Sequence, residues 1–422
     1  MNDAEIIAVG SELLTPERLD TNSLFLTEQL NALGVEVREK RIIGDDRTLL
    51  TAGISEALVH AQIVILTGGL GPTEDDLTRD AVAVALGRRL EFSQEICGWI
   101  ERRFATIRRK MAEINKRQAY LVEGAEAIEN PHGTAPGQWI EHDGRIIMLL
   151  PGPPRELKPM FVERCAPRLQ RILPVAVIRS RFYRVAGMGE SDLDALIAPV
   201  YTRYTNPATT ILSGLGDIQI HLRARCSKAE EADALLAQVA PEIESLLGDR
   251  IYSNNGDSLE AVVGQMLRDS GATLSVAESC TGGLVGQRVT SVPGSSDYFV
   301  GGFLVYNDAM KTKLLGVDPQ LLAARTAVSE EVAQAMAEGA REHTGSTYAI
   351  SVTGEAGPES SSGAPVGTLI FGFAGPGASE TRRIQFGGDR ERIRELAAQI
   401  ALDFVRRQLL PRQSEAPTSQ QH

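Results

Sequence analysis

Short apolar runs alternate with amphipathic segments in the first 170 residues. The runs predict strands at Glu5–Val9, Val35–Ile43, Ile63–Leu66 and Ile146–Leu150. The segments between them predict helices that start at Thr21 or Asn22 and end at Gly34, then at Leu49–Val59 and at about Asp75–Leu86. The apolar face of the first helix should comprise Leu24, Leu26, Leu30 and Leu33. Alternating strands and helices predict right-handed crossovers and a mostly parallel sheet.

The pattern changes between residues 175 and 250. It predicts a strand at Val175–Val185, a helix at Ser191–Tyr201, an alternating strand at Ile218–Arg223 and an amphipathic helix at Lys228–Leu247. These elements predict a small α+β unit with no catalytic motif.

A turn-rich linker at Ser253–Asp257 precedes a second α/β pattern. Strands are predicted at Thr273–Ala277, Phe299–Tyr306, Tyr348–Val352, Gly367–Phe373 and Thr381–Phe386. Helices are predicted at Leu259–Leu267, Glu330–Arg341 and Arg390–Leu409. We therefore predict an α/β protein with two three-layer α/β domains, at 1–170 and 253–410, each with a mostly parallel sheet. A small α+β domain at 171–252 joins them, and 411–422 form a disordered tail.

The composition narrows the function classes. Of the 422 residues, 43% are hydrophobic, which is enough for cores of domain size and excludes general disorder. A formal net charge of -12 and an aromatic content of 5% argue against nucleic acid as a partner. The 4 scattered cysteines and 6 histidines predict neither a disulfide framework nor a His-rich metal cage. The acidic N-terminus and the lack of a membrane-length apolar run predict a cytoplasmic protein without a membrane partner.

Three loops follow predicted strands of the C-terminal domain. They are Glu278–Gly283, Tyr306–Lys311 and Thr353–Pro358. Ligand sites gather beyond the carboxyl ends of parallel strands, so we expect Ser279, Lys311 and Thr353 on one rim. A buried lysine can act as base for a serine nucleophile, and the backbone N–H groups of Thr281 to Gly283 can form an oxyanion hole or hold a phosphate. Alternatively, Ser279 is a helix N-cap and Lys311 is a solvated helix residue.

The string Thr67–Thr78 dominates the N-terminal domain. Its glycines permit a tight turn whose N–H groups face an anion, and the acids that follow can hold a divalent cation. Acidic turns recur at Gly10–Glu12 and Gly44–Asp46, which favours a ligand site on this rim. Alternatively, Asp75 and Asp76 cap the next helix.

A basic segment lies between the predicted elements of this domain. It contains Arg102, Arg103, Arg108, Arg109, Lys110, Lys116 and Arg117. We expect a solvated face paired with Glu101 and Glu113, or a lid that supplies charge to a pyrophosphate.

Residues 257–410 resemble the nicotinamide-nucleotide amidase domain of the CinA (competence-damage-inducible) family. The motifs are Ala277–Gly283, Val305-Tyr306-Asn307-(x3)-Lys311, Ala327–Ser329, Val352-Thr353-Gly354-(x2)-Gly357-Pro358 and Pro365–Thr368. The chain departs from the family pattern at Asn307, Glu355 and Glu359–Ser362. The resemblance implies deamidation of nicotinamide mononucleotide to nicotinic acid mononucleotide and ammonia, without a cofactor.

The same resemblance implies roles for individual residues. Ser279 is the expected nucleophile, Lys311 its base, Tyr306 an auxiliary group and Thr353 a residue that positions the acyl group. The expected substrate-binding residues are Thr281, Gly282, Gly283, Gly354, Arg390 and Arg394, the two arginines meeting the ligand's phosphate.

Residues 1–170 resemble the molybdopterin-binding (MoaB/MogA-like) fold, as found in the first domain of full-length CinA proteins. The motifs are Gly10–Leu14, Asp20–Asn22, Gly44–Asp46, Thr67–Thr78, Asn130-(x2)-Gly133–Gly137 and Leu150–Pro154. The resemblance implies ADP-ribose pyrophosphate hydrolysis with a divalent metal ion. It makes Glu12, Asp45, Asp46 and Asp76 candidate metal or catalytic acids, and Gly68, Gly69, Gly71 and Thr73 the phosphate loop. The middle domain is KH-like by its position in the family, and a homo-oligomer, a dimer, is expected.

Two alternatives remain beside this bifunctional pyridine-nucleotide salvage enzyme. In the first, the N-terminal domain binds a pterin or nucleotide without turnover, and one or neither site is active. In the second, the protein is a DNA- or RNA-associated competence factor. The negative charge and the acidic surroundings of Gly187–Glu190 argue against the second.

Overall fold

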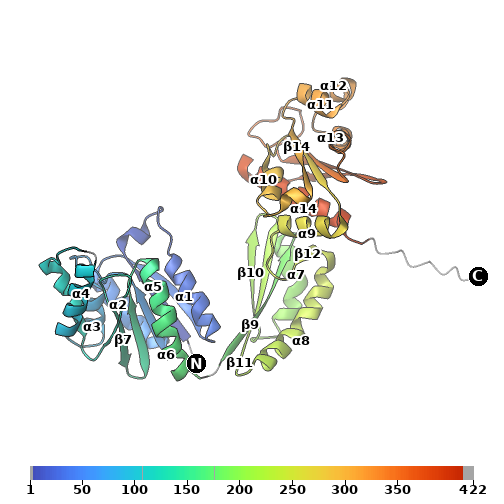
Figure 1. Cartoon of the computed structure of the whole chain (residues 1–422). Coiled ribbons are helices and arrows are strands. Elements are labelled where there is room, and N and C mark those ends of the chain that lie inside the picture. The colour runs from blue at the N-terminus through green and yellow to red at the C-terminus, as the bar shows by residue number, and fades with distance from the viewer. Residues whose placement is uncertain (1–2, 107, 175, 412–422) are drawn as a thin grey trace, which may run out of the picture. The chain divides into compact units, whose positions relative to one another are not determined.

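The computed structural model describes residues 3–106, 108–174 and 176–411. The chain divides into two compact units (Figure 1). The first extends to Arg179 and includes Arg225–Asp233, and the second comprises Ser180–Ala224 and the chain from Ala234 onward. The predicted tail lies outside the described residues, except for Pro411.

A six-stranded sheet forms the centre of the first unit. Its strand order is β2-β1-β3-β8-β7-β6, in which β2, β1, β3 and β8 are parallel and β7 and β6 are antiparallel. The strands are β1 (Asp3–Val9), β2 (Glu36–Ile43), β3 (Ile63–Thr67), β6 (Glu126–Ile128), β7 (Gly137–His142) and β8 (Arg145–Leu150). This order places the ends of β1, β3 and β8 side by side at one edge.

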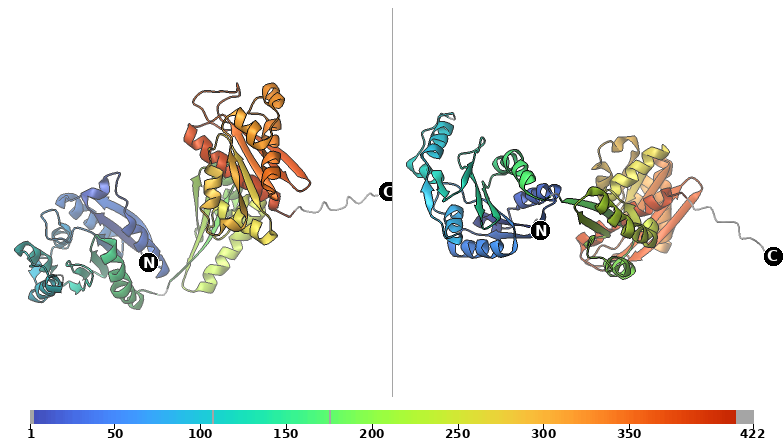
Figure 2. Two further views of the ribbon diagram at one scale, coloured as in Figure 1. Left: turned by 45° about the horizontal axis from the view of Figure 1, so that its top comes forward. Right: turned by 90° about the horizontal axis from the view of Figure 1, so that it is seen from below.

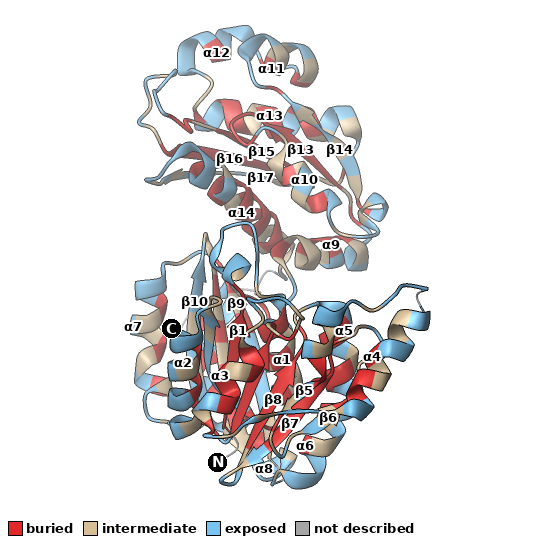
Figure 3. Ribbon diagram, turned by 90° about the vertical axis from the view of Figure 1, so that its left-hand side faces the viewer, coloured by how far each residue is buried: buried red, intermediate tan, exposed pale blue. Residues whose placement is uncertain are grey.

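Helices cover both faces of this sheet, because alternate residues of each strand point to opposite sides. Ile7, Val64 and Leu66 pack with α2 (Arg47–His60) and α3 (Thr78–Ala85). Ile6 and Ile65 pack with α1 (Thr21–Ala32), α5 (Pro154–Met160) and α6 (Ala166–Ile172) on the other face. The predicted three-layer arrangement is therefore confirmed (Figure 3).

The remaining elements of the first unit lie beside the sheet or in its connections. A small hairpin joins β4 (Leu90–Phe92) and β5 (Tyr120–Val122), and the chain between them forms α4 (Gln94–Thr106) and a 3-10 segment at Glu113–Ala119. A second 3-10 turn, Ser11–Leu14, follows β1, and a π-helical turn, Phe161–Cys165, links α5 to α6.

Most of a four-stranded sheet of order β10-β11-β9-β12 belongs to the second unit. Its strands are β9 (Val177–Val185), β10 (Ala208–Gly214), β11 (Asp217–Cys226) and β12 (Ile251–Ser253). Buried and half-buried residues alternate along β11, so one face of the sheet is covered. Helices α7 (Glu190–Tyr201) and α8 (Ala229–Leu247) lie on the same side of the sheet (Figure 1), which completes the predicted small α+β unit.

A five-stranded sheet of order β14-β13-β15-β16-β17 follows. The strands are β13 (Leu274–Glu278), β14 (Phe299–Leu304), β15 (Tyr348–Gly354), β16 (Thr368–Gly375) and β17 (Ala378–Gln385). β14, β13 and β15 are parallel, and β16 and β17 continue the sheet in antiparallel order. β13 therefore lies between two parallel neighbours, and its carboxyl end is flanked on both sides.

Helices also cover both faces of this sheet (Figure 2). One face packs on α9 (Leu259–Ser270), α10 (Leu284–Thr290) and α14 (Arg390–Leu409). The other packs on α11 (Asp308–Leu315), α12 (Pro319–Arg325) and α13 (Glu330–Thr344). Among the described helices, none has both the length and the apolar character needed to cross a membrane.

Two details differ from the sequence-based expectations. Leu24 is 62% exposed, so the buried apolar face of α1 rests on Leu26 and Leu30 instead. Helix α3 begins at Thr78 and not at about Asp75, because Asp76 is engaged in the preceding loop and does not cap the helix.

Candidate functional site

The carboxyl end of β13 is fixed by its two neighbours. The N–H of Ser279 donates to the carbonyl of Val352 at 2.9 Å, and the N–H of Val305 donates to the carbonyl of Glu278 at 2.9 Å. The loops that carry Ser279, Tyr306 and Thr353 therefore leave the sheet side by side, as the predicted rim requires. Ser279 itself is 8% exposed.

Sequence reasoning missed the role of Glu278, which is buried directly before Ser279. Its carboxylate accepts hydrogen bonds from the backbone N–H groups of Gly283 (3.0 Å), Val285 (3.1 Å) and Gly286 (2.8 Å). The N–H of Gly282 donates to the carbonyl of Ser279 at 3.2 Å. The expectation that the N–H groups of Gly282 and Gly283 are open to an oxyanion or a phosphate is therefore wrong for this structure. Gly282 and Gly283 both have positive φ, 62° and 95°, which lets the loop fold back over the carboxylate.

Lys311 is buried within α11, contrary to the alternative of a solvated helix residue. Its side chain is 1% exposed, and its Nζ lies 3.4 Å from Asp308 Oδ1, a carboxylate that is 59% exposed. Asn307 caps this helix by accepting a hydrogen bond from the N–H of Met310 at 2.9 Å. No hydrogen bond joins Ser279 Oγ to Lys311 Nζ among the described residues; such contacts are often long before a substrate binds.

Thr353 and Gly354 anchor the third loop of the rim. Thr353 Oγ1 donates to the carbonyl of Ala327 at 2.8 Å, so the hydroxyl links β15 to the segment before α13. A Cβ on Gly354 would lie 2.4 Å from the carbonyl oxygen of Thr368, so only glycine fits between β15 and β16 there.

The two arginines near the start of α14 hold these loops together. Arg390 donates to the carbonyl of Gly357 at 2.7 Å and to the Tyr306 hydroxyl at 2.9 Å. Arg394 donates to the carbonyl of Thr281 at 2.8 Å. Since each guanidinium has five N–H donors, both retain donors for an anionic group near the rim.

The two residues that follow Ser279, Cys280 and Thr281, are both buried. Burial raises the pKa of the Cys280 thiol to about 12, so this thiol is protonated at neutral pH and is a poor nucleophile. The Thr281 hydroxyl is fully buried, and its Oγ1 has no hydrogen-bond partner among the described residues. Since a buried polar atom without a partner is costly, Thr281 is a candidate contact for a bound polar group.

The loop after β15 contains residues at which the chain departs from the family pattern, and several of their polar groups are hydrogen-bonded to one another. Glu355 is 4% exposed and accepts hydrogen bonds from the N–H groups of Ser361 (3.1 Å) and Ser362 (2.7 Å) and from Ser361 Oγ (3.1 Å). Burial acts to raise the pKa of Glu355, but the hydrogen bonds from Ser362 and Ser361 outweigh it and lower the pKa. The acid and the two serines thus form one satisfied group.

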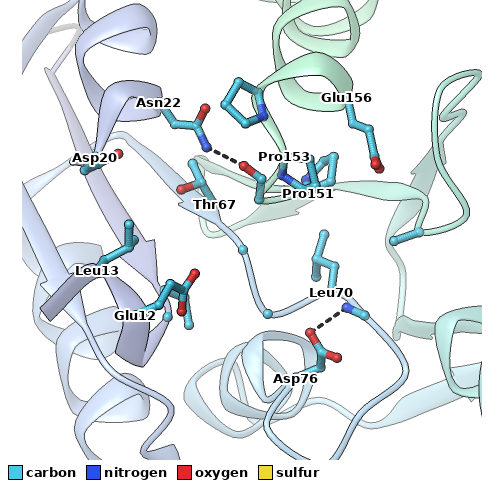
Figure 4. Close-up of a pocket in the computed structure, with 18 of the residues that line it drawn as sticks. Glu12, Leu13, Asp20, Asn22, Thr67, Leu70, Asp76, Pro151, Pro153 and Glu156 are labelled. Carbon is cyan, nitrogen blue, oxygen red and sulfur yellow. Dashed lines mark hydrogen bonds between the residues drawn. The ribbon is translucent and has the colours of Figure 1, made fainter. Parts of the chain in front are cut away.

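The first unit contains a cavity of about 670 Å³ at the carboxyl ends of β1, β3 and β8 (Figure 4). Six carboxylates and one guanidinium, that of Arg18, line it, and none of the described lining residues is aromatic. The acids are Glu12, Asp20, Asp45, Asp75, Asp76 and Glu156. An uncompensated diphosphate would be repelled there, so the cavity favours a ligand that brings a cation.

The glycine-rich loop that lines this cavity is held in place by hydrogen bonds to other groups of the protein. Asp76 accepts hydrogen bonds from the N–H of Gly71 (2.7 Å), the N–H of Thr73 (2.8 Å) and the Thr73 hydroxyl (2.5 Å). The N–H of Gly68 donates to the carbonyl of Leu150 at 3.0 Å. Gly68 and Gly69 have positive φ, and a Cβ on Gly68 would lie 2.3 Å from the Val9 carbonyl oxygen. The N–H groups of Gly68, Gly71 and Thr73 are therefore engaged within the protein.

The four candidate metal acids do not form one cluster. Asp46 caps α2 through the N–H groups of Thr48 and Leu49 and is not among the lining residues. Asp45 accepts from the N–H of Ser11 at 2.9 Å, and Glu12 lines the cavity. In the described part of the chain, no three His, Cys, Asp or Glu side chains lie close enough to hold a metal ion. An all-protein metal cage does not fit, whereas Mg²⁺ commonly uses one or two carboxylates and substrate phosphates.

Asn22, part of the Asp20–Asn22 motif, lines this cavity, and Arg79, which sequence reasoning did not single out, holds the glycine-rich loop. Asn22 Nδ2 donates to the carbonyl of Gly152 at 2.7 Å, which leaves Oδ1 as an acceptor without a partner among the described residues. Arg79 is buried and donates to the carbonyls of Leu70 (2.7 Å) and Gly71 (2.8 Å). Arg79 has no pattern of its own in the sequence, because its partners are backbone carbonyls.

The residues of the basic segment have different surroundings. Lys116 pairs with Glu113 at 2.7 Å, as expected, and Arg117 pairs with Glu74 at 2.5 Å. Arg102 and Arg103 line a separate cavity beside α4.

Three known protein families match successive parts of the chain. Residues 5–171 match the family described as a probable molybdopterin binding domain, 180–253 match the damage-inducible protein CinA KH domain, and 256–409 match the CinA C-terminal domain.

Full-length relatives are also similar. A CinA-like protein of Solibacter usitatus (strain Ellin6076) is 60% identical over 408 residues, covering 96% of this chain and 98% of its own. A putative competence-damage inducible protein of Moorella thermoacetica is 43% identical over the same shares. The crystal structure of competence damage-inducible protein A from Klebsiella pneumoniae is 35% identical, covers 37% of this chain and 97% of its own, and has a TM-score of 0.36.

Proposed function

Because the chain belongs to the CinA family, we propose that it is a hydrolase with two nucleotide sites. The C-terminal site deamidates nicotinamide mononucleotide, and the N-terminal site hydrolyses the diphosphate bond of ADP-ribose. The observation that carries the proposal is the placement of Ser279, at the flanked end of β13, in the domain that also buries Lys311.

The amide hydrolysis proceeds in two steps. Ser279 Oγ attacks the carboxamide carbon while Lys311 takes its proton, and the C–N bond breaks as ammonia leaves with that proton. Water then splits the acyl ester to give the carboxylate and free Ser279. Each step needs one group that moves a proton, and the proposal assigns this role to Lys311.

Other residues of the rim support this reaction. Arg390 and Arg394 hold the loops and keep donors for the phosphate of the mononucleotide. The unpartnered Thr281 hydroxyl is a hydrogen-bond donor beside Ser279. Thr353 fixes the neighbouring loop through Ala327 and so acts as a positioning residue.

The N-terminal proposal rests on the charge of its cavity. A divalent cation bound to the diphosphate would neutralise it and meet one or two of the carboxylates of Glu12, Asp45 and Asp76. When bound, such a cation offsets the charge that develops on the phosphate oxygens. The residues of the chain itself bind and orient the ligand, and no described group is assigned as base for the attacking water.

A second candidate for this cavity is binding without turnover. It is favoured by Asp76, whose two oxygens are engaged by Gly71 and Thr73. A pterin has the weaker case as occupant, because none of the described residues that line the cavity is aromatic and could stack on it.

A substrate panel tests both sites in the full chain. Ammonia should be released from nicotinamide mononucleotide, and AMP and ribose 5-phosphate from ADP-ribose. A chelator of divalent cations should stop the second reaction and leave the first unchanged. Tight binding of ADP-ribose without any product would favour the non-catalytic alternative instead.

A further inference from the structure

A second cavity, of about 350 Å³, lies beside the acidic one in the first unit. Its walls include Trp99, Arg102 and Arg103 of α4 and residues of the segment 129–136. Thr134 lines both cavities, so they share a wall. The volume is at the lower end of the range for small-molecule sites, about 300–1,000 Å³.

The wall between the cavities is a defined structure. Asn130, which lines the second cavity, donates from Nδ2 to Glu156 Oε2 at 2.8 Å and to the Ala135 carbonyl at 2.8 Å. Glu156 lines the first cavity. A Cβ on Gly133 would lie 1.8 Å from Glu156 Oε2, so a larger residue there would displace the Glu156 carboxylate from its present position. The two cavities are therefore held next to each other by buried or half-buried polar contacts.

The two cavities have opposite charge. The second is lined by two arginines and by one acid, Glu129, which pairs with Arg164 at 3.4 Å. Neither Arg102 nor Arg103 forms an ion pair with any other described residue. A net positive cavity thus adjoins a strongly negative one.

Stabilisation of the α4 carboxyl end is the competing explanation for these arginines, since cations are favourable there. It does not account for their orientation, because both side chains line the cavity and Arg103 is half-buried.

We propose that this second cavity binds a nucleoside monophosphate. Arg102 and Arg103 hold the phosphate, because guanidinium groups bind phosphate oxygens in pairs. The half-buried indole of Trp99 provides an aromatic surface for the base. The inference rests on the proposed function, since hydrolysis of a nucleoside diphosphate ester in the neighbouring cavity releases such a monophosphate.

Titration of Trp99 fluorescence with AMP in the full chain, without divalent metal, tests the inference. We expect a saturable change in fluorescence for the unmodified chain. The apparent affinity for AMP should be at least about tenfold weaker in the double variant Arg102→Gln with Arg103→Gln. The matched control, Arg109→Gln with Lys110→Gln, alters exposed basic residues outside the cavity lining and should titrate as the unmodified chain does. Adenosine, which lacks the phosphate, should also bind at least about tenfold more weakly.

Three results would overturn it: no saturable change, equal titration of the unmodified chain and the Arg102/Arg103 variant, or a signal that persists in Trp99→Phe and so comes from Trp139. Asp76→Ala separates AMP binding from catalysis: this variant should lose ADP-ribose hydrolysis but show the same titration as the unmodified chain. If the unmodified chain hydrolyses ADP-ribose but does not bind AMP, only this inference is refuted. AMP binding without any hydrolysis would refute only the proposed pyrophosphatase.

Discussion

The Glu278 carboxylate accepts a hydrogen bond from the backbone N–H of Gly283 at 3.0 Å, across the loop that contains Ser279. The same carboxylate also receives the N–H groups of Val285 and Gly286 at the start of α10. The loop between β13 and α10 is thus closed on itself by the residue that precedes the candidate nucleophile.

Glu278→Gln should therefore lower turnover without a comparable change in KM. A glutamine places one NH₂ group against backbone N–H donors, so at least one of the three amides loses its acceptor. We expect a loss of about 1–3 kcal/mol in the free energy of unfolding, together with a lower kcat for ammonia release. Glu342→Gln, an exposed change on α13, is the control. Unchanged kcat in Glu278→Gln would show that the loop does not need this carboxylate.

Lys311→Met should abolish deamidation while leaving the fold intact. Methionine fills similar volume in the buried position and removes the group that takes the proton of Ser279. Loss of a general base typically costs about 10²–10⁴-fold in rate. Lys313→Met, an exposed change on the same helix, should retain full activity. Steady-state ammonia assays and thermal unfolding check both variants, and substantial activity in Lys311→Met would remove the lysine from the mechanism.

Asp76→Ala should stop ADP-ribose hydrolysis and spare ammonia release. The change leaves the N–H groups of Gly71 and Thr73 and the Thr73 hydroxyl without their acceptor, which should cost about 1–3 kcal/mol of stability. Product analysis with both substrates, at a temperature where the variant is folded, measures the effect. Equal loss of both activities would indicate general unfolding and contradict a separate N-terminal site.

Glu355→Gln should change the dependence of stability on pH. The pKa of Glu355 is lowered in the folded chain from 4.5, so its contribution is present above about pH 4.5 and lost as pH falls through the lower folded value. The variant should be less stable than the unmodified chain at pH 7 by about 1–2 kcal/mol, and this difference should shrink below about pH 4.5. Urea unfolding between pH 3 and 7 measures it. A difference that is constant with pH would contradict the assigned hydrogen bonds.

The spacing of apolar residues along the sequence predicted the architecture, because that spacing reflects which residues of each helix and strand are buried. Runs such as Ile63–Leu66 are buried on both faces, and only a central strand covered by helices on both sides explains them. Exposure of Leu24 was not predictable, because it depends on how far α1 rotates over the sheet. The start of α3 at Thr78 likewise depends on a loop contact, between Asp76 and Gly71.

The site was predictable only to the level of loops. The pattern alone places loops with Ser279, Lys311 and Thr353 after strands of one sheet; the order β14-β13-β15, which makes those strand ends neighbours, comes from the structure. The partners of individual polar groups do not, because Glu278, Arg390 and Arg394 bond to backbone atoms that carry no residue-specific signal. The buried state of Lys311 also required the packed structure, since one lysine in a short helix has no distinguishing pattern.

The central claim is that Ser279 is the nucleophile of an amidase. Its most direct test is ammonia release from nicotinamide mononucleotide by Ser279→Ala, with Ser291→Ala at the end of α10 as the matched control. The account predicts that Ser279→Ala releases no ammonia above background, retains ADP-ribose hydrolysis and unfolds at the same temperature, while Ser291→Ala keeps full activity. Ammonia release by Ser279→Ala at the rate of the unmodified chain would contradict it.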